Sequence, residues 1–69
     1  GVSMRELKDG SFKASVRTHG DINASEICKR LGGGGHAGAA GCTLYGTKQQ
    51  AINSLLKEIQ AEIDAFTIN

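Results

Sequence analysis

Residues 32–42 read Gly-Gly-Gly-Gly-His-Ala-Gly-Ala-Ala-Gly-Cys, and this stretch separates a predicted helix from a predicted strand. A glycine in regular structure costs about 0.5–1 kcal/mol relative to alanine, so four in succession indicate a tight turn or a ligand close to the backbone. Successive N–H groups in such a loop can form a concave anion site. His36 follows at once, and its ring can donate a hydrogen bond to a phosphate or stack on a base. We therefore predict a phosphate-binding loop at Gly33, Gly34, Gly35 and His36, and a flexible loop with a surface histidine remains the alternative.

Two other glycine motifs are excluded by their surroundings. Gly33-x-Gly35-x-x-Gly38 matches the dinucleotide-binding pattern, which needs a strand before it and a helix after it. Here a helix is predicted before the run and a strand after it. The chain also contains no GxxxxGK[ST] segment, so a Walker-type phosphate loop is excluded as well.

Upstream of the glycine run, the pattern predicts a β-hairpin. A first short strand near residues 2–7 is followed by the Asp9-Gly10 turn signal, and residues 12–17 then alternate between apolar and polar. The polar face carries Lys13, Ser15 and Arg17. Arg17 is the second candidate ligand-binding residue, because a guanidinium can bind phosphate through two parallel hydrogen bonds. Lys13 and Ser15 share this face and could extend a polar groove, but we interpret both as solvent-facing. We interpret His19 as a loop residue.

Between and beyond these segments, capping signals predict two helices. Asn23, with Glu26 three residues later, predicts a helix to about Leu31 with Gly32 at its C-terminus. Residues 42–45 predict a third strand, and Thr47 with Gln50 predicts the start of a long second helix. We expect that helix to pack one apolar face on the sheet, formed by Ile52, Leu55, Leu56, Ile59, Ile63 and Phe66. The expected fold class is α/β, of the α+β type, with about three strands and two helices in the order β-β-α-β-α.

Composition limits the functional classes. The 69 residues make a single domain, 1–69, and the net charge of +1 does not favour a broad duplex-binding surface. Cys28 and Cys42 have neither disulfide-framework nor zinc-finger spacing, so we interpret them as small buried side chains in a reducing cytosol. The apolar runs are too short to span a membrane. We therefore expect a cytoplasmic domain with no metal and no cofactor of its own.

Three segments together resemble a known family. They are Lys13-Ala-Ser-Val-Arg-Thr18, Gly20-Asp-Ile-Asn-Ala-Ser-Glu-Ile-Cys-Lys-Arg-Leu31 and the glycine run from Gly32 to Cys42. This arrangement resembles the DHHA1 domain of DHH-superfamily phosphoesterases, and the Ala-Ala-Gly-Cys ending is most similar to the nanoRNase and pAp-phosphatase branch. The resemblance covers roughly residues 1–66. It implies an accessory domain that is N-terminally truncated, a fragment of a larger domain.

The resemblance also implies a function. In such enzymes a separate N-terminal DHH domain holds manganese and hydrolyses phosphodiesters, while the DHHA1 domain closes over a short RNA, single-stranded DNA or mononucleotide. The nucleotide-holding roles fall on Arg17, Gly33, Gly34, Gly35 and His36. The family's catalytic Asp and His motifs have no counterpart here, so no catalytic residue is expected in this chain.

Several alternatives remain open at this level. Similar accessory domains occur in RecJ-type exonucleases, cyclic-dinucleotide phosphodiesterases and alanyl-tRNA synthetases. A protein-interaction or homodimerisation domain is a second class of function. Catalysis by His36 with Cys28 or Cys42 is a third, and nothing in the sequence orders such a set of groups.

Overall fold

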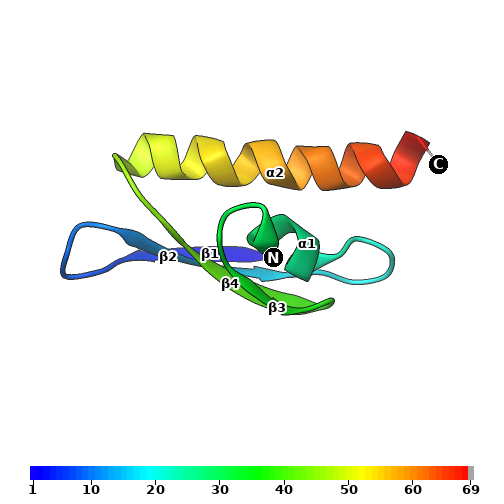
Figure 1. The fold of residues 1–69 in the computed structure, drawn as a ribbon, viewed down its shortest axis with the longest axis horizontal. Coiled ribbons are helices and arrows are strands. Elements are labelled where there is room, and N and C mark those ends of the chain that lie inside the picture. Colours follow the sequence, from blue (N-terminus) through cyan, green and yellow to red (C-terminus); the bar gives the residue numbers. More distant parts are fainter. Residues whose placement is uncertain (69) are drawn as a thin grey trace.

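The computed structural model describes residues 1–68, which form a four-stranded antiparallel sheet with both helices on one face (Figure 1). The strand order is β1-β2-β4-β3, so β1 and β3 are the two edges of the sheet. The α+β class expected from the sequence is confirmed. In chain order the elements are β1 Val2–Glu6, β2 Phe12–Arg17, α1 Ala24–Lys29, β3 Gly34–His36, β4 Ala39–Leu44 and α2 Lys48–Ile68.

The hairpin predicted around Asp9-Gly10 joins β1 to β2. The two strands pair antiparallel, with Met4 opposite Ala14. The Asp9 carboxylate accepts hydrogen bonds from the Ser11 hydroxyl at 2.5 Å and the Ser11 amide at 3.0 Å, and these bonds lower its pKa. Gly10 has φ 88°, a conformation that a residue with a side chain rarely adopts. The Asp9 hydrogen bonds and the positive φ of Gly10 therefore stabilise the predicted turn.

The expectation of a loop at residues 33–36 and of three strands is wrong in one respect. Gly34–His36 forms a short fourth strand, β3, which pairs with β4 through Gly35 opposite Ala40. A strand needs backbone hydrogen bonds rather than side chains, and the bare backbone allows an unusually close approach. A Cβ added to Gly35 would lie 2.7 Å from the Ala40 Cα.

Helix α1 begins at its predicted cap and ends before Leu31. The Asn23 side chain accepts a hydrogen bond from the Glu26 amide at 3.1 Å, as a capping residue should. The predicted capping box is only half formed, because the Asn23 amide donates to the Glu62 carboxylate at 3.4 Å instead of to Glu26. At the other end, the Gly33 amide donates to the Cys28 carbonyl at 2.7 Å, and the Gly32 amide donates to the Lys29 carbonyl at 3.1 Å. Gly32 has φ 84°, which is the left-handed conformation of a Schellman motif. The first glycine of the run thus ends the helix.

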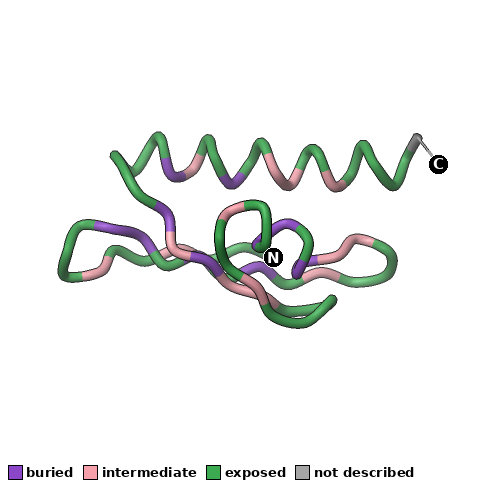
Figure 2. The backbone as a smooth tube through the Cα atoms, in the orientation of Figure 1, coloured by how far each residue is buried: buried purple, intermediate pink, exposed green. Residues whose placement is uncertain are grey.

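The core lies between the sheet and the helices, as the buried positions in Figure 2 show. The predicted capping box of α2 is confirmed, because Thr47 and Gln50 exchange hydrogen bonds of 2.8 and 3.1 Å. The expected apolar face of α2 is only partly buried. The buried apolar residues are Phe12, Ala14, Val16, Ala24, Ile27, Cys28, Cys42, Leu44, Ala51 and Leu55, whereas Leu56, Ile63 and Phe66 are exposed.

The later turns of α2 lie against α1 rather than the sheet, which explains the exposure of Ile63 and Phe66. The Arg30 guanidinium, just beyond α1, donates to the Glu58 carboxylate at 3.0 Å and to the Glu62 carboxylate at 3.2 Å. It also donates to the Glu58 carbonyl oxygen at 3.2 Å. This clamp joins the two helices by polar contacts, so Ile63 and Phe66 find no apolar surface to cover them.

Candidate functional site

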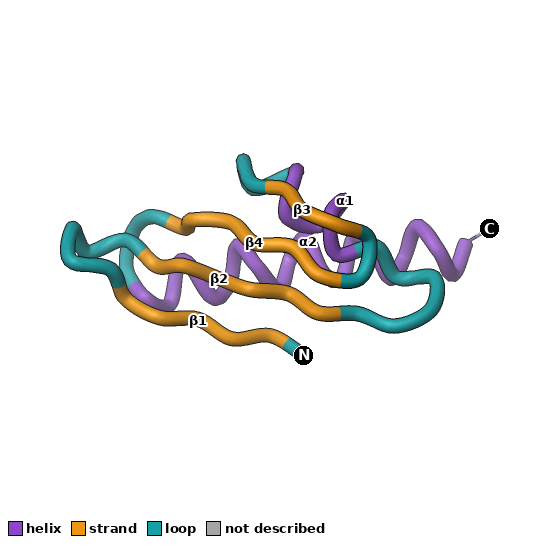
Figure 3. The backbone as a smooth tube through the Cα atoms, turned by 90° about the horizontal axis from the view of Figure 1, so that it is seen from below, coloured by secondary structure: helices purple, strands orange, loops and turns teal. Residues whose placement is uncertain are grey.

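The face of the sheet opposite the helices is uncovered in the described part of the chain (Figure 3). In β2, alternate residues point to opposite faces, and the burial pattern follows this alternation. Ala14 and Val16 are buried under the helices, whereas Lys13, Ser15 and Arg17 are exposed on the other side. This second side, which we call the open face, carries the arginine that the sequence singled out.

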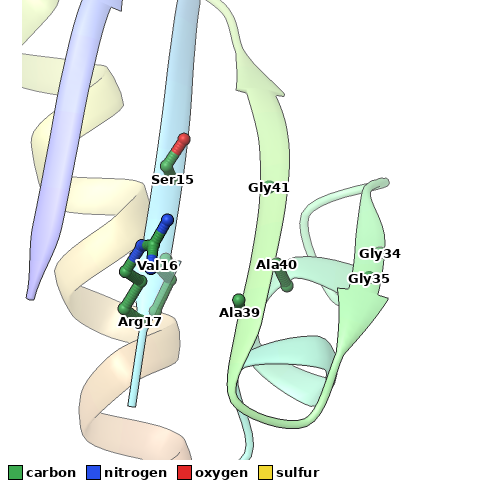
Figure 4. A pocket seen from close by; sticks show the side chains of 8 residues that line it. All are labelled: Ser15, Val16, Arg17, Gly34, Gly35, Ala39, Ala40 and Gly41. Atoms are coloured by element: carbon green, nitrogen blue, oxygen red, sulfur yellow. The ribbon is translucent and has the colours of Figure 1, made fainter.

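An open pocket of about 300 Å³ lies on the open face and brings Arg17 together with the glycine strand. The strand order explains this, because β4 lies between β2 and β3 and contributes small residues in the middle. Figure 4 shows the Ser15 and Arg17 side chains standing beside a nearly bare floor formed by β4 and β3. The lining residues are Ser15, Val16, Arg17, Gly34, Gly35, Ala39, Ala40 and Gly41.

Part of this lining escaped the sequence interpretation. Ser15, which we interpret from the sequence as solvent-facing, borders the pocket, so the alternative of a polar groove beside Arg17 applies to it. Gly41 lies directly opposite Ser15 in the sheet register. The small residues at 39–41 were the available signal, because a strand of alanine and glycine leaves room above the sheet. Only the register shows that this room adjoins Arg17, which pairs with Ala39.

The three candidate glycines differ in whether packing within the domain would allow a side chain at their positions. A Cβ on Gly33 would collide with the Gly41 carbonyl oxygen and the Cys42 side chain, and a Cβ on Gly35 would collide with Ala40. Close packing within the domain therefore explains these two residues. Gly34 has no atom within 4 Å of a Cβ added to it, and its φ is not positive. Nothing within the described residues requires glycine at 34, although the position borders the pocket.

The backbone amides also differ from the sequence expectation. The Gly33 amide is already bonded to the Cys28 carbonyl, so it is not free to hold a ligand. The expectation of a ligand-facing amide is therefore wrong at Gly33, because helix capping uses that N–H. Gly34–His36 form an edge strand, and alternate residues of an edge strand direct their N–H and C=O groups away from the sheet.

His36 lies on the open face but does not line the pocket. It pairs with Ala39, which on its other side pairs with Arg17, so the three side chains share one face. Two strand spacings separate Arg17 from His36, which places their backbones about 10 Å apart. The imidazole and the guanidinium thus belong to residues on the two sides of Ala39.

Hydrogen bonds hold the β3–β4 turn in place beside α1. The Thr18 amide donates to the Gly38 carbonyl at 3.1 Å, and the Thr18 hydroxyl donates to the Ala37 carbonyl at 3.1 Å. The Ala24 amide, in the first turn of α1, donates to the same Ala37 oxygen at 2.8 Å. The position of His36 is therefore fixed by the turn that follows it.

The cysteines belong to the core and do not join His36. Cys28 and Cys42 are free thiols and both are buried, on the helix side of the sheet. Burial raises the pKa of both thiols, and the neighbouring Cys28 helps to raise the pKa of Cys42 to about 11. A buried, protonated thiol is a poor nucleophile. The hypothesis of a His36–Cys catalytic pair therefore has no geometric basis.

The described residues contain no group of three His, Cys, Asp or Glu side chains that could hold a metal ion. The donor set of residues 1–68 therefore does not fit a metal centre, and no hydrolytic step is assigned to them. None of the helices in the described part of the chain has the length and apolar character needed to cross a membrane.

A second cavity, of about 290 Å³, lies between edge strand β1 and helix α2. Its lining is mostly apolar and includes Val2 and Leu56, which are 51% and 56% exposed. It lies on the helix side of the sheet, at the edge opposite β3, so it is separate from the Arg17 pocket on the open face. The remaining lining residues are Met4, Lys48, Ile52, Leu55 and Ile59.

Comparison with known proteins identifies a matching family model and two related enzymes. Residues 2–65 match the model of the DHHA1 domain family. The chain is 40% identical over 63 residues to the bifunctional oligoribonuclease and PAP phosphatase NrnA of Thermus thermophilus, covering 90% of this chain and 19% of that protein. It is 54% identical over 39 residues to oligoribonuclease NrnB of Bacillus subtilis, covering 55% of this chain and 10% of that protein. The chain thus spans a fifth or less of the length of either relative.

Proposed function

Because the chain belongs to the DHHA1 domain family, an accessory domain of DHH phosphoesterases, we propose that it binds the nucleotide end of a short RNA, a single-stranded DNA or a mononucleotide such as pAp. The observation that carries the proposal is the pocket that Arg17 shares with Gly34, a glycine that packing within the domain does not require. The names of the two relatives, an oligoribonuclease with PAP phosphatase activity and an oligoribonuclease, favour this class of ligand.

In this proposal the pocket holds phosphate by charge and by close approach. The Arg17 side chain is exposed and has no acidic partner among the described residues, so its N–H groups are available to a phosphate. Gly34 lets the ligand approach the backbone of β3, where outward N–H groups of the edge can donate hydrogen bonds. His36 then contacts the base or a second phosphate oxygen from the far side of Ala39.

In this proposal, a different domain carries out the hydrolysis. A separate DHH domain, N-terminal to this one and holding manganese, carries out the cleavage, and the open face forms one wall of the cleft between the two domains. We place the assembly in the cytoplasm, which suits two free buried thiols. The isolated chain should therefore bind nucleotide weakly and without cleavage, because the opposite wall is missing.

Calorimetric titration with adenosine 3′,5′-bisphosphate tests the proposal. We expect weak binding to the unaltered chain and a loss of about tenfold in affinity for Arg17→Ala, since one charge-assisted interaction is removed. Lys57→Ala is the matched control, because Lys57 is an exposed cation on α2, on the other side of the sheet. Equal affinity in the unaltered and Arg17→Ala chains would remove the basis of the proposal.

The apolar groove between β1 and α2 favours a second candidate function, self-association. An exposed edge strand beside exposed apolar residues such as Val2 and Leu56 can pair with the same edge of a second copy. Sedimentation equilibrium would then show a dimer, and Leu56→Glu would return it to a monomer. A monomer at millimolar concentration in the unaltered chain would contradict this second function.

A further inference from the structure

The open face carries two more cations that the proposed pocket does not use. Arg5 on β1 pairs directly with Lys13 on β2, and both side chains are exposed. Like charges directly opposite each other in an antiparallel pair are destabilising. Neither residue has an ion-pair partner among the described residues. The fold therefore maintains an unfavourable pair of charges that its own packing does not explain.

These cations border further hollows that adjoin the Arg17 pocket. One hollow, of about 170 Å³, is lined by Ser3, Arg5, Lys13 and Ser15, together with Met4. Another, of about 250 Å³, lies between Ser3, Ser15 and Arg17 and is also bordered by Gly1 and Val2. Ser15 borders these two hollows and the Arg17 pocket, so the three form a continuous strip.

Lys13 leans toward this strip. Its Nζ atom lies 3.5 Å from the point that a Cβ on Gly41 would occupy, so the ammonium group reaches over β4. The strand residues on the open face include three cations and a histidine but no carboxylate. In chain order they are Ser3, Arg5, Lys13, Ser15, Arg17, Gly34, His36, Ala39, Gly41 and Thr43.

We infer that Arg5 and Lys13 form a second phosphate-binding site, which extends the Arg17 pocket along the sheet for a single-stranded oligonucleotide. The inference rests on the proposed function, because Arg17 anchors the first phosphate. Lys13 lies four positions before Arg17 in β2, so the backbones of the two residues are about 13 Å apart, and Arg5 lies one further strand away from the Arg17 pocket. The strip therefore takes the backbone of a short oligonucleotide, with its small residues leaving room for sugars.

A length series of 5′-phosphorylated oligoadenylates, from one to three nucleotides, tests this inference by calorimetry at low salt. In the unaltered chain the trinucleotide should bind more tightly than the mononucleotide. The double variant R5S/K13S should weaken trinucleotide binding by about tenfold. The single variant R5S should leave mononucleotide binding within about twofold, because Arg5 does not line the Arg17 pocket. For the double variant, the slope of log affinity against log salt concentration should also fall, by about 0.7 for each phosphate that the variant no longer neutralises.

The matched control is K48S/K57S, which removes the same charge from α2 on the other side of the sheet. Equal losses in the two double variants would show an effect of net charge alone and would overturn the second site. An unchanged preference for length in R5S/K13S would overturn it as well. Tight binding of oligoglutamate at the same residues would assign the strip to an acidic protein instead. Failure of the proposed function is read separately, from Arg17→Ala with the mononucleotide.

Discussion

Arg17 and His36 lie on the same face of the sheet, on the two sides of Ala39, with which each of them pairs. They are nineteen positions apart in the chain, and the order β2-β4-β3 brings them to within two strand spacings. A basic side chain and an imidazole therefore flank a floor of small residues. This relationship explains the small residues of β3 and β4, because larger side chains there would fill the pocket beside Arg17.

The glycines provide a test that separates packing from ligand binding. Gly35→Ala should lower the free energy of unfolding by about 1–3 kcal/mol, because its Cβ would lie 2.7 Å from the Ala40 Cα. Gly34→Ala should keep or raise the stability, by up to about 1 kcal/mol, since its Cβ meets no atom. Urea denaturation measures both values. If Gly34→Ala unfolds as easily as Gly35→Ala, glycine at 34 is structural.

Gly34→Ala should weaken nucleotide binding even though it preserves the fold. The added methyl group would stand at the wall of the Arg17 pocket, where the ligand must approach the backbone. We expect a severalfold loss of affinity for adenosine 3′,5′-bisphosphate by calorimetry. This corresponds to about 1 kcal/mol, the typical contribution of one hydrogen bond, because the methyl group would keep the ligand from the β3 backbone. Unchanged affinity would mean that the ligand does not touch this strand.

The geometry of the arginine should matter as much as its charge. Arg17→Lys retains a cation but loses the planar fork that binds phosphate through two hydrogen bonds. We expect this variant to recover only part of the affinity that Arg17→Ala loses. Full recovery in a titration with the mononucleotide would show that Arg17 acts as a point charge without a defined geometry.

The clamp between the helices should contribute measurably to stability. Arg30→Met removes two carboxylate interactions and a carbonyl interaction, and Glu58 and Glu62 are then left partly buried without their cation. The expected loss is about 1–2 kcal/mol by urea denaturation. Lys29→Met is the matched control, since its 3.9 Å pair with Glu26 is exposed and should contribute less than about 0.5 kcal/mol. Equal effects of the two variants would contradict the clamp.

The buried thiols predict a loss of stability in alkali. Burial raises the pKa of Cys42 from an ordinary value of 9.0 to about 11, so the folded chain holds its proton where the unfolded chain releases it. Stability from this group is complete below pH 9 and is lost as the pH rises toward 11. Urea midpoints measured from pH 8 to 11 should fall, and the fall should be smaller in Cys42→Ala. An identical fall in both chains would assign it to other groups.

The sequence predicted the fold where local signals act within a few residues. The caps at Asn23 and Thr47 and the Asp9-Gly10 turn depend on side chains beside the backbone they bond, and all three are confirmed. Strand β3 was missed because glycine has little strand preference, so its pairing follows from the neighbouring strand β4 rather than from its own residues.

The candidate site was predictable only in part, for the same reason. Arg17 and the glycine run could be singled out by residue type, but their meeting in one pocket depends on the strand order. The use of the Gly33 amide in ending α1 also required the hydrogen bonds of the folded chain. The exposure of Ile63 and Phe66 could not be read from helical spacing, because it depends on where α1 lies.

The central claim is that nucleotide rests on the open face between Arg17 and the β3 strand, and a titration of the ¹⁵N-labelled chain followed by NMR tests it most directly. Addition of adenosine 3′,5′-bisphosphate to millimolar concentration should shift the amide signals of Ser15, Arg17, Gly34, Gly35 and His36, and leave those of α2 in place. Signals that stay unchanged along β2 and β3 at that concentration, or that move instead along α2, would contradict it.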